Sequence, residues 1–203
     1  MLSESDHLSH SITDADHVYG LGGAPVTIVE YGEYECPFCK AAQPLVDELV
    51  RALGDNLRIV FRHFPVMRIH VHAEHAAEAA EAAGAQGKFW EMHKLLFDNQ
   101  NALDDESLLR YARRLGLDGN RFESDLAEHT YRSKVRADTL SALQSGARGT
   151  PTFFIDGVRY DSPPDLREML ALIREKHPGL HVPDASADIR VPGMTAYAQA
   201  TGA

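Results

Sequence analysis

The chain has 203 residues, of which 44% are hydrophobic and 25% charged, a composition typical of one medium globular domain or one domain with an insertion. Its formal net charge of −10 argues against a nucleic-acid partner, which would need a basic face to neutralise phosphates. No run approaches the roughly 18 apolar residues of a membrane span, so we expect no membrane association. Neither the basic start nor the apolar run of a secretory signal precedes Ala24, which predicts a cytoplasmic protein.

Residues 1–15 are polar and lack apolar periodicity, which predicts a mobile tail. A short β-branched run at 26–31 then predicts a buried strand. Pro37 is favoured at the first position of a helix, and apolar residues continue at helical spacing until Gly54. A second apolar run at 57–61 has the length of a strand. The result is a strand–helix–strand unit long enough for a parallel crossover.

The middle of the chain is predicted to be helical. Apolar periodicity predicts five helices, at 73–83, at 89–97, between Asp104 and Gly116, at 121–128 and at 131–145. Two short strands follow at 152–155 and 158–160, and the Asp156-Gly157 turn between them is a hairpin signal. A closing helix is predicted at 165–175.

The predicted order is therefore β-α-β, a block of helices, then β-β-α. We expect an α/β domain formed by residues 16–72 and 147–176. A helical block at 73–146 interrupts this domain, and residues 177–203 form an irregular C-terminal extension.

Cys36 and Cys39 are the only two cysteines of the chain, and Pro37 and Phe38 separate them. Three residues along a helix place two sulfurs within bonding reach, since a disulfide needs Cα atoms about 4.4–6.8 Å apart. In a reducing cytosol such a pair is more often catalytic or metal-binding than structural. Beside a β/α pattern it indicates a redox motif.

The two cysteines are predicted to have different roles. If Pro37 opens the helix, Cys36 is its N-cap, where free backbone N–H groups and the helix dipole lower a thiol pKa. Cys36 is therefore the predicted nucleophile, and Cys39, one turn further in, the predicted resolving cysteine. Glu33 and Glu35 lie just upstream and would oppose this effect, so we expect moderate activation of Cys36.

Two segments, VEYGEYECPFC at 29–39 and GTPTFF at 149–154, resemble motifs of the thioredoxin superfamily, in particular its DsbA-like branch with a helical insertion. The resemblance covers roughly residues 16–176 and implies a thioredoxin-like fold. It implies that Pro151 is cis and faces the disulfide, with Thr150 before it. Pro37, Phe38, Thr150 and Pro151 are then the predicted substrate-binding residues.

The resemblance also assigns a role to Glu30, which lies six residues before Cys36, where the superfamily places a buried carboxylate. Glu30 would then assist deprotonation of Cys39, which requires a pKa raised by burial. The alternative is a solvent-exposed residue at the end of a strand.

These features predict a thiol:disulfide oxidoreductase whose Cys36–Cys39 disulfide is redox-active and needs no cofactor. Its partners would be disulfides or dithiols in proteins, peptides or small thiols, together with a redox partner. The dipeptide Pro37-Phe38 is similar to that of glutaredoxins and lacks the histidine of DsbA, which favours a potential of about −180 to −230 mV. The physiological direction and the oligomeric state remain open.

A second interpretation is a thioredoxin-like binding or zinc module without redox turnover. His63, His70, His72 and His75 follow the second strand, and two of them with the two cysteines would complete a tetrahedral zinc site. We expect no metal, because the chain has no second Cys-x-x-Cys and three of these histidines lie near the start of a helix, where polar residues face solvent. Phe89 and Trp90 are expected in the core.

Overall fold

The computed structural model of the protein describes residues 6–185. The predicted α/β class and the order β-α-β, helices, β-β-α are confirmed, with one additional strand at the start. The elements are β1 (His17–Gly20), β2 (Val26–Gly32), α1 (Pro37–Leu53), the short 3-10 helix η2 (Gly54–Asn56), β3 (Leu57–His63), α2 (Ala73–Gly84), α3 (Phe89–Asp98), α4 (Asp105–Arg114), α5 (Gly119–Ala127), α6 (Arg132–Gln144), β4 (Thr152–Ile155), β5 (Val158–Tyr160) and α7 (Leu166–Lys176).

The strands form one mixed sheet in the order β1-β3-β2-β4-β5. β2 and β3 are parallel and joined through α1, whereas the other neighbouring pairs are antiparallel. All seven residues of β2 are buried, because strands flank it on both sides and helices cover both faces. Glu30 on this strand lies opposite Phe61 of β3 and Phe153 of β4, so an acidic side chain sits in the middle of the sheet.

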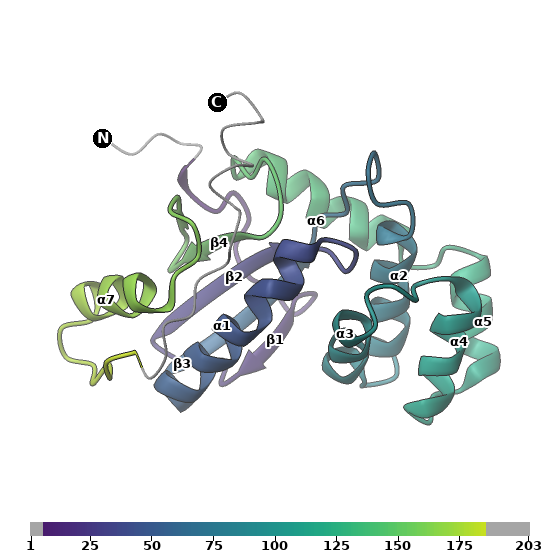
Figure 1. Ribbon diagram of the computed structural model, residues 1–203, viewed down its shortest axis with the longest axis horizontal. Coiled ribbons are helices and arrows are strands. Elements are labelled where there is room, and N and C mark those ends of the chain that lie inside the picture. The colour runs from purple at the N-terminus through teal and green to yellow at the C-terminus, as the bar shows by residue number, and fades with distance from the viewer. Residues whose placement is uncertain (1–5, 186–203) are drawn as a thin grey trace.

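Helices cover the two faces of the sheet. On one face, Ile28 packs with Leu45 of α1 and Leu170 of α7. On the other, Val29 packs with Ala142 of α6, as expected when successive strand residues point to opposite faces. Figure 1 shows α1 lying along the sheet with α7 at one end.

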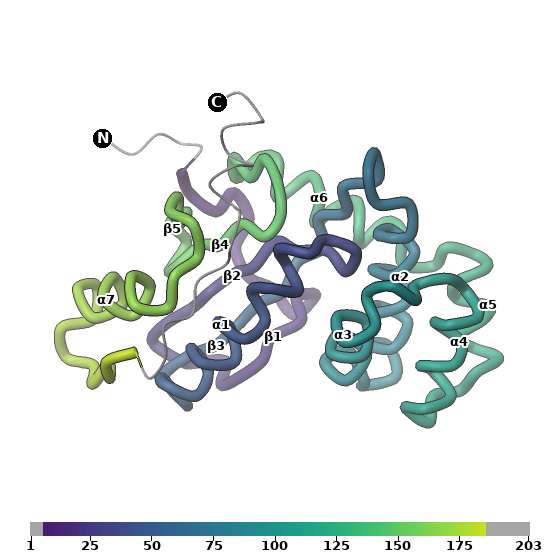
Figure 2. The backbone as a smooth tube through the Cα atoms, viewed as in Figure 1, coloured from purple at the N-terminus to yellow at the C-terminus, as the bar shows by residue number. Residues whose placement is uncertain are grey.

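Helices α2 to α5 form a block beside the sheet, as the backbone trace in Figure 2 shows. Their apolar side chains form a core cluster that also includes Phe61 of β3. Cys36 and Cys39 belong to this same core cluster, so the pair lies where the sheet domain meets the helical block. The next helix, α6, packs on the sheet, and its Ser141 hydroxyl lies 2.6 Å from the Tyr31 hydroxyl. The domain boundary predicted at residue 146 therefore follows a helix that already shares the core of the sheet.

The prediction of a mobile N-terminal tail is wrong for its described part, residues 6–15. His7 forms a bridge with Val158 of β5, and the Ser9 backbone N–H donates to Ser145 Oγ at 2.9 Å. The buried Arg62 guanidinium donates to the backbone carbonyls of His10 and Ser11. Residues far away in the sequence hold this segment in place, and no local apolar pattern could have predicted these contacts.

Strand β1 was not predicted. It pairs antiparallel with β3; Val18 packs against the apolar core beneath α6, and the His17 ring stacks on Phe89 with ring centroids 3.5 Å apart. Asp16, just before the strand, accepts hydrogen bonds of 2.7 and 2.9 Å from the Nε and Nη2 atoms of Arg62. Backbone pairing and this ion pair position β1, and a strand with so few buried side chains gives a weak sequence signal.

The predicted C-terminal extension is irregular over residues 177–185, where buried Val182 packs against α7 and the Arg174 guanidinium donates to its carbonyl. Residues 1–5 and 186–203, which complete the predicted tail and extension, lie outside the described part of the chain. No helix between residues 6 and 185 is long and apolar enough to cross a membrane.

Candidate active site

The cysteine pair lies at the start of α1, at the C-terminal end of the central strand β2. Cys36 is the N-cap residue with extended backbone angles, and Pro37 occupies the first turn, as predicted from the sequence. Cys36 is 4% exposed and Cys39 is fully buried. Both thiols are free in this structure, which represents the reduced protein.

The surroundings shift the two thiol pKa values in opposite directions. A hydrogen bond with the Cys39 thiol lowers the pKa of Cys36 from 9.0 to about 6 and outweighs burial, with help from Thr150 and the backbone N–H groups of Cys39 and Phe38. Those N–H groups stabilise the negative charge on Cys36 Sγ, although the Cys36 side chain forms no capping hydrogen bond. Burial, followed by interactions with Cys36, raises the pKa of Cys39 well above its ordinary value. Cys36 is therefore thiolate at neutral pH while Cys39 retains its proton.

Thr150 and Pro151 lie directly beside the pair. The peptide bond between them is cis, and they precede β4, which neighbours β2 in the sheet. When it is protonated, the Cys36 thiol donates to the backbone carbonyl oxygen of Thr150 at 3.3 Å. Antiparallel pairing of β2 and β4 thus brings the segment before β4 to the cysteine that follows β2.

Glu30 lies deep in the protein and not at an exposed strand end. It is 1% exposed, and its Oε1 atom has no hydrogen-bond partner. Burial, with a smaller contribution from the charge of Cys36, raises the pKa of Glu30 to about 8. The charge of Glu30 in turn contributes to the raised pKa of Cys39, so the carboxyl acts on the resolving thiol. A carboxyl with such a pKa can gain and lose a proton near neutral pH.

Pro37 and Phe38, the other two predicted substrate-binding residues, have different surroundings. Pro37 is exposed and lines a cavity of about 440 Å³, whose wall also includes His70, His72 and Gln100. Phe38 is half-buried and packs against the apolar core on both sides of α1. The substrate-binding role of both residues stays a prediction.

Gln100, in the loop after α3, was not identified from the sequence. Its side-chain amide donates to the backbone carbonyls of Tyr34 at 2.8 Å and Cys36 at 2.7 Å. The helical block thereby holds the backbone of the active-site loop. A single glutamine in a loop carries no pattern from which this role could have been inferred.

Two acidic residues before Cys36 hold a neighbouring loop. Glu33 is buried and hydrogen-bonded to His70, and Glu35 accepts from the backbone N–H of His72 at 2.7 Å. Burial raises the pKa of Glu33 to about 7, although the hydrogen bond with His70 opposes this shift, and the charge of Cys36 adds to it. The sequence placed both carboxylates near the sulfur but did not predict their histidine partners.

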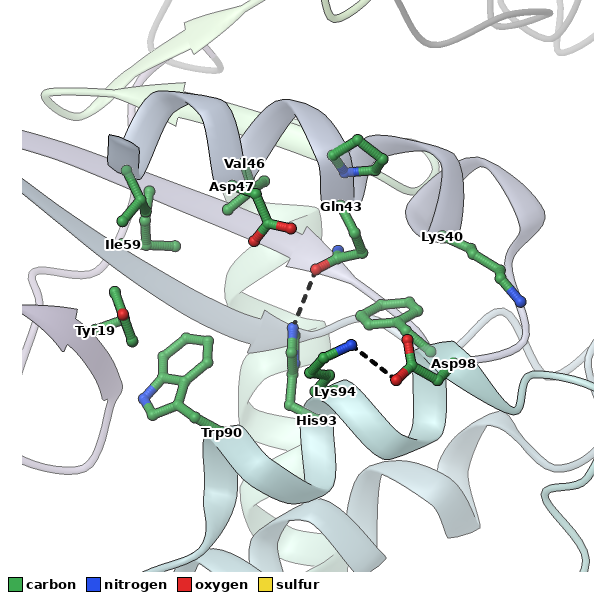
Figure 3. A pocket seen from close by; sticks show the side chains of 13 residues that line it. Tyr19, Lys40, Gln43, Val46, Asp47, Ile59, Trp90, His93, Lys94 and Asp98 are labelled. Atoms are coloured by element: carbon green, nitrogen blue, oxygen red, sulfur yellow. Dashed lines mark hydrogen bonds and ion pairs between the residues drawn. The ribbon is translucent and has the colours of Figure 1, made fainter. Parts of the chain in front are cut away.

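A hydrogen-bonded chain connects α1 to α3 beside a second cavity of about 440 Å³, shown in Figure 3. Gln43 donates to the carbonyl of Cys39 at 3.2 Å, and its Oε1 lies 3.4 Å from His93 Nε2. His93 Nδ1 lies 3.1 Å from the Tyr34 hydroxyl. Burial, with the charge of His63, lowers the pKa of His93 to about 3, so the ring is neutral. Trp90 lines this cavity and is partly buried against the apolar core, and Phe89 is in the core as expected.

The histidines of the zinc interpretation do not gather around the cysteines. Each pairs with a carboxylate: His63 with Glu81, His70 with Glu33, His72 with Glu35 and His75 with Asp105. Within residues 6–185, no group of side chains with metal-ligand spacing includes a cysteine. The arrangement therefore does not support the predicted Cys2His2 alternative.

Comparison with known proteins identifies a family and several relatives that this chain resembles. A family model described as thioredoxin matches residues 12–175. The chain is 46% identical over 160 residues to a Na(+)/H(+) antiporter, NhaA 3, of Salinispora tropica, covering 79% of this chain and 24% of the relative. The chain spans about a quarter of the length of the curated relatives it matches.

Two solved structures are similar over nearly their whole length. A thioredoxin-like oxidoreductase from Silicibacter pomeroyi has a TM-score of 0.73 and 27% identity, covering 82% of this chain and 95% of that one. DsbA2 of Pseudomonas aeruginosa has a TM-score of 0.67 and 26% identity, covering 84% of this chain and 99% of that one.

Proposed function

Because the chain belongs to the thioredoxin family and resembles its DsbA-like thiol-disulfide oxidoreductases in fold, we propose that Cys36 and Cys39 exchange disulfide bonds with protein or peptide substrates. The observation that carries this proposal is that the pKa values of the two thiols are shifted in opposite directions. The pKa of Cys36 is lowered to about 6 and that of Cys39 is raised, which separates a nucleophile from a resolving thiol.

In the reducing direction, the Cys36 thiolate attacks one sulfur of a substrate disulfide. The bond from Cys36 to the substrate forms as the substrate S–S bond breaks, and the departing sulfur leaves as a thiolate that takes up a proton. Cys39 then loses its proton and attacks Cys36 Sγ, which releases the second substrate sulfur. The substrate gains two electrons and the cysteine pair becomes a disulfide, which a separate redox partner must reduce. Oxidation of a substrate dithiol follows the same steps in reverse.

Glu30 is the proposed proton carrier for Cys39. Its carboxyl is buried with an unpartnered oxygen, and its pKa of about 8 lies near neutral pH. In the reducing direction its ionised form takes the Cys39 proton, and in the oxidising direction its protonated form returns one. It touches neither substrate nor Cys36 in this scheme and acts only through the resolving thiol.

The proposed substrate is an extended polypeptide that lies beside Thr150 and Pro37. Ionisation of Cys36, which precedes its attack on a substrate, would free the Thr150 carbonyl from the hydrogen bond that it accepts from the protonated thiol. The cavity beside Pro37 lies next to the loop that carries His70 and His72, and that loop exposes three apolar side chains to solvent: Met67, Ile69 and Val71. A substrate with apolar residues near its cysteine suits this surface.

A trapping experiment tests the proposal. With dithiothreitol as reductant and insulin as substrate, the wild-type protein should accelerate insulin reduction, and Cys36→Ser should not. Cys39→Ser should accumulate a mixed disulfide, visible on a non-reducing gel, because no second thiol resolves it. If neither acceleration nor a mixed disulfide is seen with wild type and Cys39→Ser, the protein is a binding module and the proposal is wrong.

We also propose the cytoplasm as the compartment, which rests on the sequence alone. Alkylation of thiols in intact cells, with one reagent that crosses the membrane and one that does not, tests it. A cytoplasmic protein should be labelled only by the permeant reagent.

A further inference from the structure

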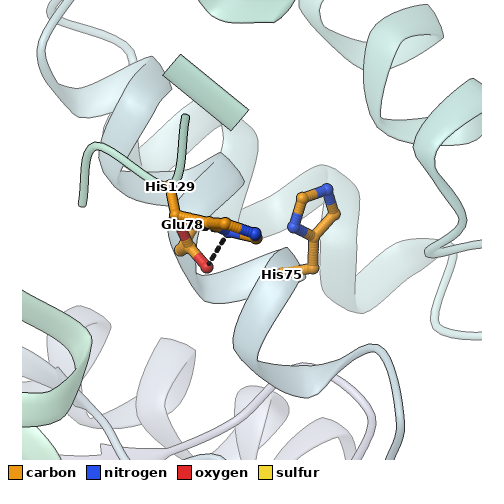
Figure 4. A group of neighbouring side chains, drawn as sticks. All are labelled: His75, Glu78 and His129. Carbon is orange, nitrogen blue, oxygen red and sulfur yellow. Dashed lines mark hydrogen bonds and ion pairs between the residues drawn. The ribbon is translucent and has the colours of Figure 1, made fainter. Parts of the chain in front are cut away.

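A second cluster of polar side chains lies on the helical block, outside the cysteine site. His75 and Glu78 come from α2, and His129 comes from the turn between α5 and α6. One ligand atom from each of the three lies within 4.8 Å of the other two, and Figure 4 shows both rings beside the carboxylate. We propose that His75, Glu78 and His129 bind a divalent transition-metal ion, with zinc as the best-fitting member of that class.

The donor set suits zinc. Two imidazoles and one carboxylate form a known three-residue zinc set that leaves a fourth position for water. Spacing of three residues puts His75 and Glu78 on the same face of α2. Zinc bonds of about 2.0–2.2 Å place tetrahedral ligand atoms roughly 3.4 Å apart. Zinc binding would require the three ligand atoms, which lie within 4.8 Å of one another, to close to this spacing.

A supporting carboxylate orients His75. Its Nε2 atom lies 3.1 Å from Asp105 Oδ1. In Figure 4 one ring nitrogen of His75 is directed toward Glu78 and His129, and the other points away. Because Nε2 pairs with Asp105, the inward nitrogen is Nδ1, free to act as a ligand. Metal-binding histidines characteristically donate their other N–H to a carboxylate in this way.

Arg132 lies next to the three proposed ligands and already places a positive charge there. The side chain of Glu78 is 1% exposed, and a buried carboxylate needs a compensating positive charge. Arg132 supplies it, with Nη2 3.0 Å from His129 and Nε 3.7 Å from Glu78, while that Nε makes no hydrogen bond. Arg132 also reaches Glu74, with Nε 3.4 Å from Oε2. A metal ion and the guanidinium therefore compete for Glu78 and His129, and Glu74 can retain Arg132 when the metal binds.

The backbone conformation at His129 allows a substitution that removes the ring without straining the chain. His129 has a φ of +53° at the end of α5, where Thr130 donates to the Asp125 carbonyl at 2.9 Å. Glycine is the residue that this helix ending favours. His129→Gly therefore removes the ring without opposing the local backbone conformation.

Calorimetric titration of the full chain with zinc chloride tests the site. The protein is first oxidised, so that the Cys36–Cys39 disulfide leaves no thiol to bind zinc. Wild type should bind one zinc ion per chain, and His129→Gly and Glu78→Gln should lose this binding. Asp105→Asn should weaken it by about 10–100-fold, the usual effect of losing a supporting partner. Arg132→Gln should bind more tightly than wild type, because the competing cation is gone.

The control is His181→Ala, which removes an exposed histidine that follows α7, at the opposite end of the molecule from α5 (Figure 1). It should bind zinc as wild type does, and zinc should raise the melting temperature of both but not of His129→Gly. Absence of saturable binding by wild type would overturn the proposal. Unchanged binding by His129→Gly and Glu78→Gln, or weaker binding by Arg132→Gln, would do the same. Insulin reduction plays no part in these readouts, so they are independent of the proposed redox function.

Discussion

The Sγ atom of Cys36 lies 3.3 Å from the backbone carbonyl oxygen of Thr150, a residue 114 positions later in the chain. This contact exists because β2 and β4 are neighbours in the sheet, although the whole helical block separates them in sequence. The reduced thiol thus has a partner on the segment where a substrate backbone is proposed to lie. Nucleophile and substrate-binding loop are fixed relative to each other by strand pairing.

Alkylation with iodoacetamide should discriminate between the two thiols of the reduced protein. Cys36 should react first, because its pKa is about 6 and the pKa of the fully buried Cys39 is raised. Its rate should rise between about pH 5 and 7 and then level off. Mass mapping after brief labelling at several pH values measures this. Equal labelling of Cys39, or a midpoint near the ordinary thiol pKa of about 8.5, would contradict the assigned roles.

Replacement of Glu30 by Gln should slow the second step of exchange more than the first. The amide cannot accept the Cys39 proton, whereas the Cys36 thiolate is already formed at neutral pH. Stopped-flow traces with a fluorescent disulfide peptide resolve both phases, and the loss in the second phase should be on the order of 100-fold at pH 7, the lower end of what a positioned acid or base contributes. The matched control is Glu123→Gln, an exposed carboxylate on α5. If the second phase of Glu30→Gln matches wild type, the carboxyl is not the proton carrier.

The same substitution should stabilise the reduced protein, increasingly so as the pH rises. The pKa of Glu30 is raised from 4.5 to about 8, so its contribution to stability is fully present below about pH 4.5 and is lost as pH rises through 8. Glutamine does not titrate and carries no such loss. Urea unfolding should show Glu30→Gln more stable by on the order of 1–4 kcal/mol at pH 8, with a smaller difference at pH 5. A pH-independent difference would be inconsistent with a titrating buried carboxyl.

Loss of the Gln100 side chain should destabilise the active-site loop. Gln100→Ala leaves the carbonyls of Tyr34 and Cys36 without their donor, at a cost of about 1–3 kcal/mol. Gln144→Ala, on an exposed position at the end of α6, should change stability by less than about 0.5 kcal/mol. Urea unfolding of the two variants at one pH compares them directly. Equal stability would show that the helical block does not hold this loop through Gln100.

The sequence predicted the elements whose signals are local. The start of α1 at Pro37 and the hairpin turn at Asp156-Gly157 are present as predicted. Proline restricts the backbone φ angle and glycine permits a positive one, and both effects are independent of the surrounding fold. The cysteine spacing and its N-cap position likewise depend only on neighbouring residues.

The features that the sequence did not predict depend on distant partners. Asp16 and Arg62, which fix the segment before β1, are 46 residues apart, and Gln100 is 64 residues from the carbonyl of Cys36. A polar residue that finds its partner only in the folded sheet has no periodicity to reveal it. For the same reason, the sequence predicts a solvent-facing His70, whereas the structure pairs this residue with buried Glu33.

The redox equilibrium of the Cys36–Cys39 pair tests the central claim most directly. The protein is equilibrated in glutathione buffers of graded potential, quenched with acid, and its free thiols are tagged with a maleimide for mass spectrometry. We predict that both thiols disappear together in one two-electron transition, with a midpoint of about −180 to −230 mV. Persistence of two free thiols across the whole range, or independent glutathionylation of each cysteine without an internal disulfide, would contradict the account.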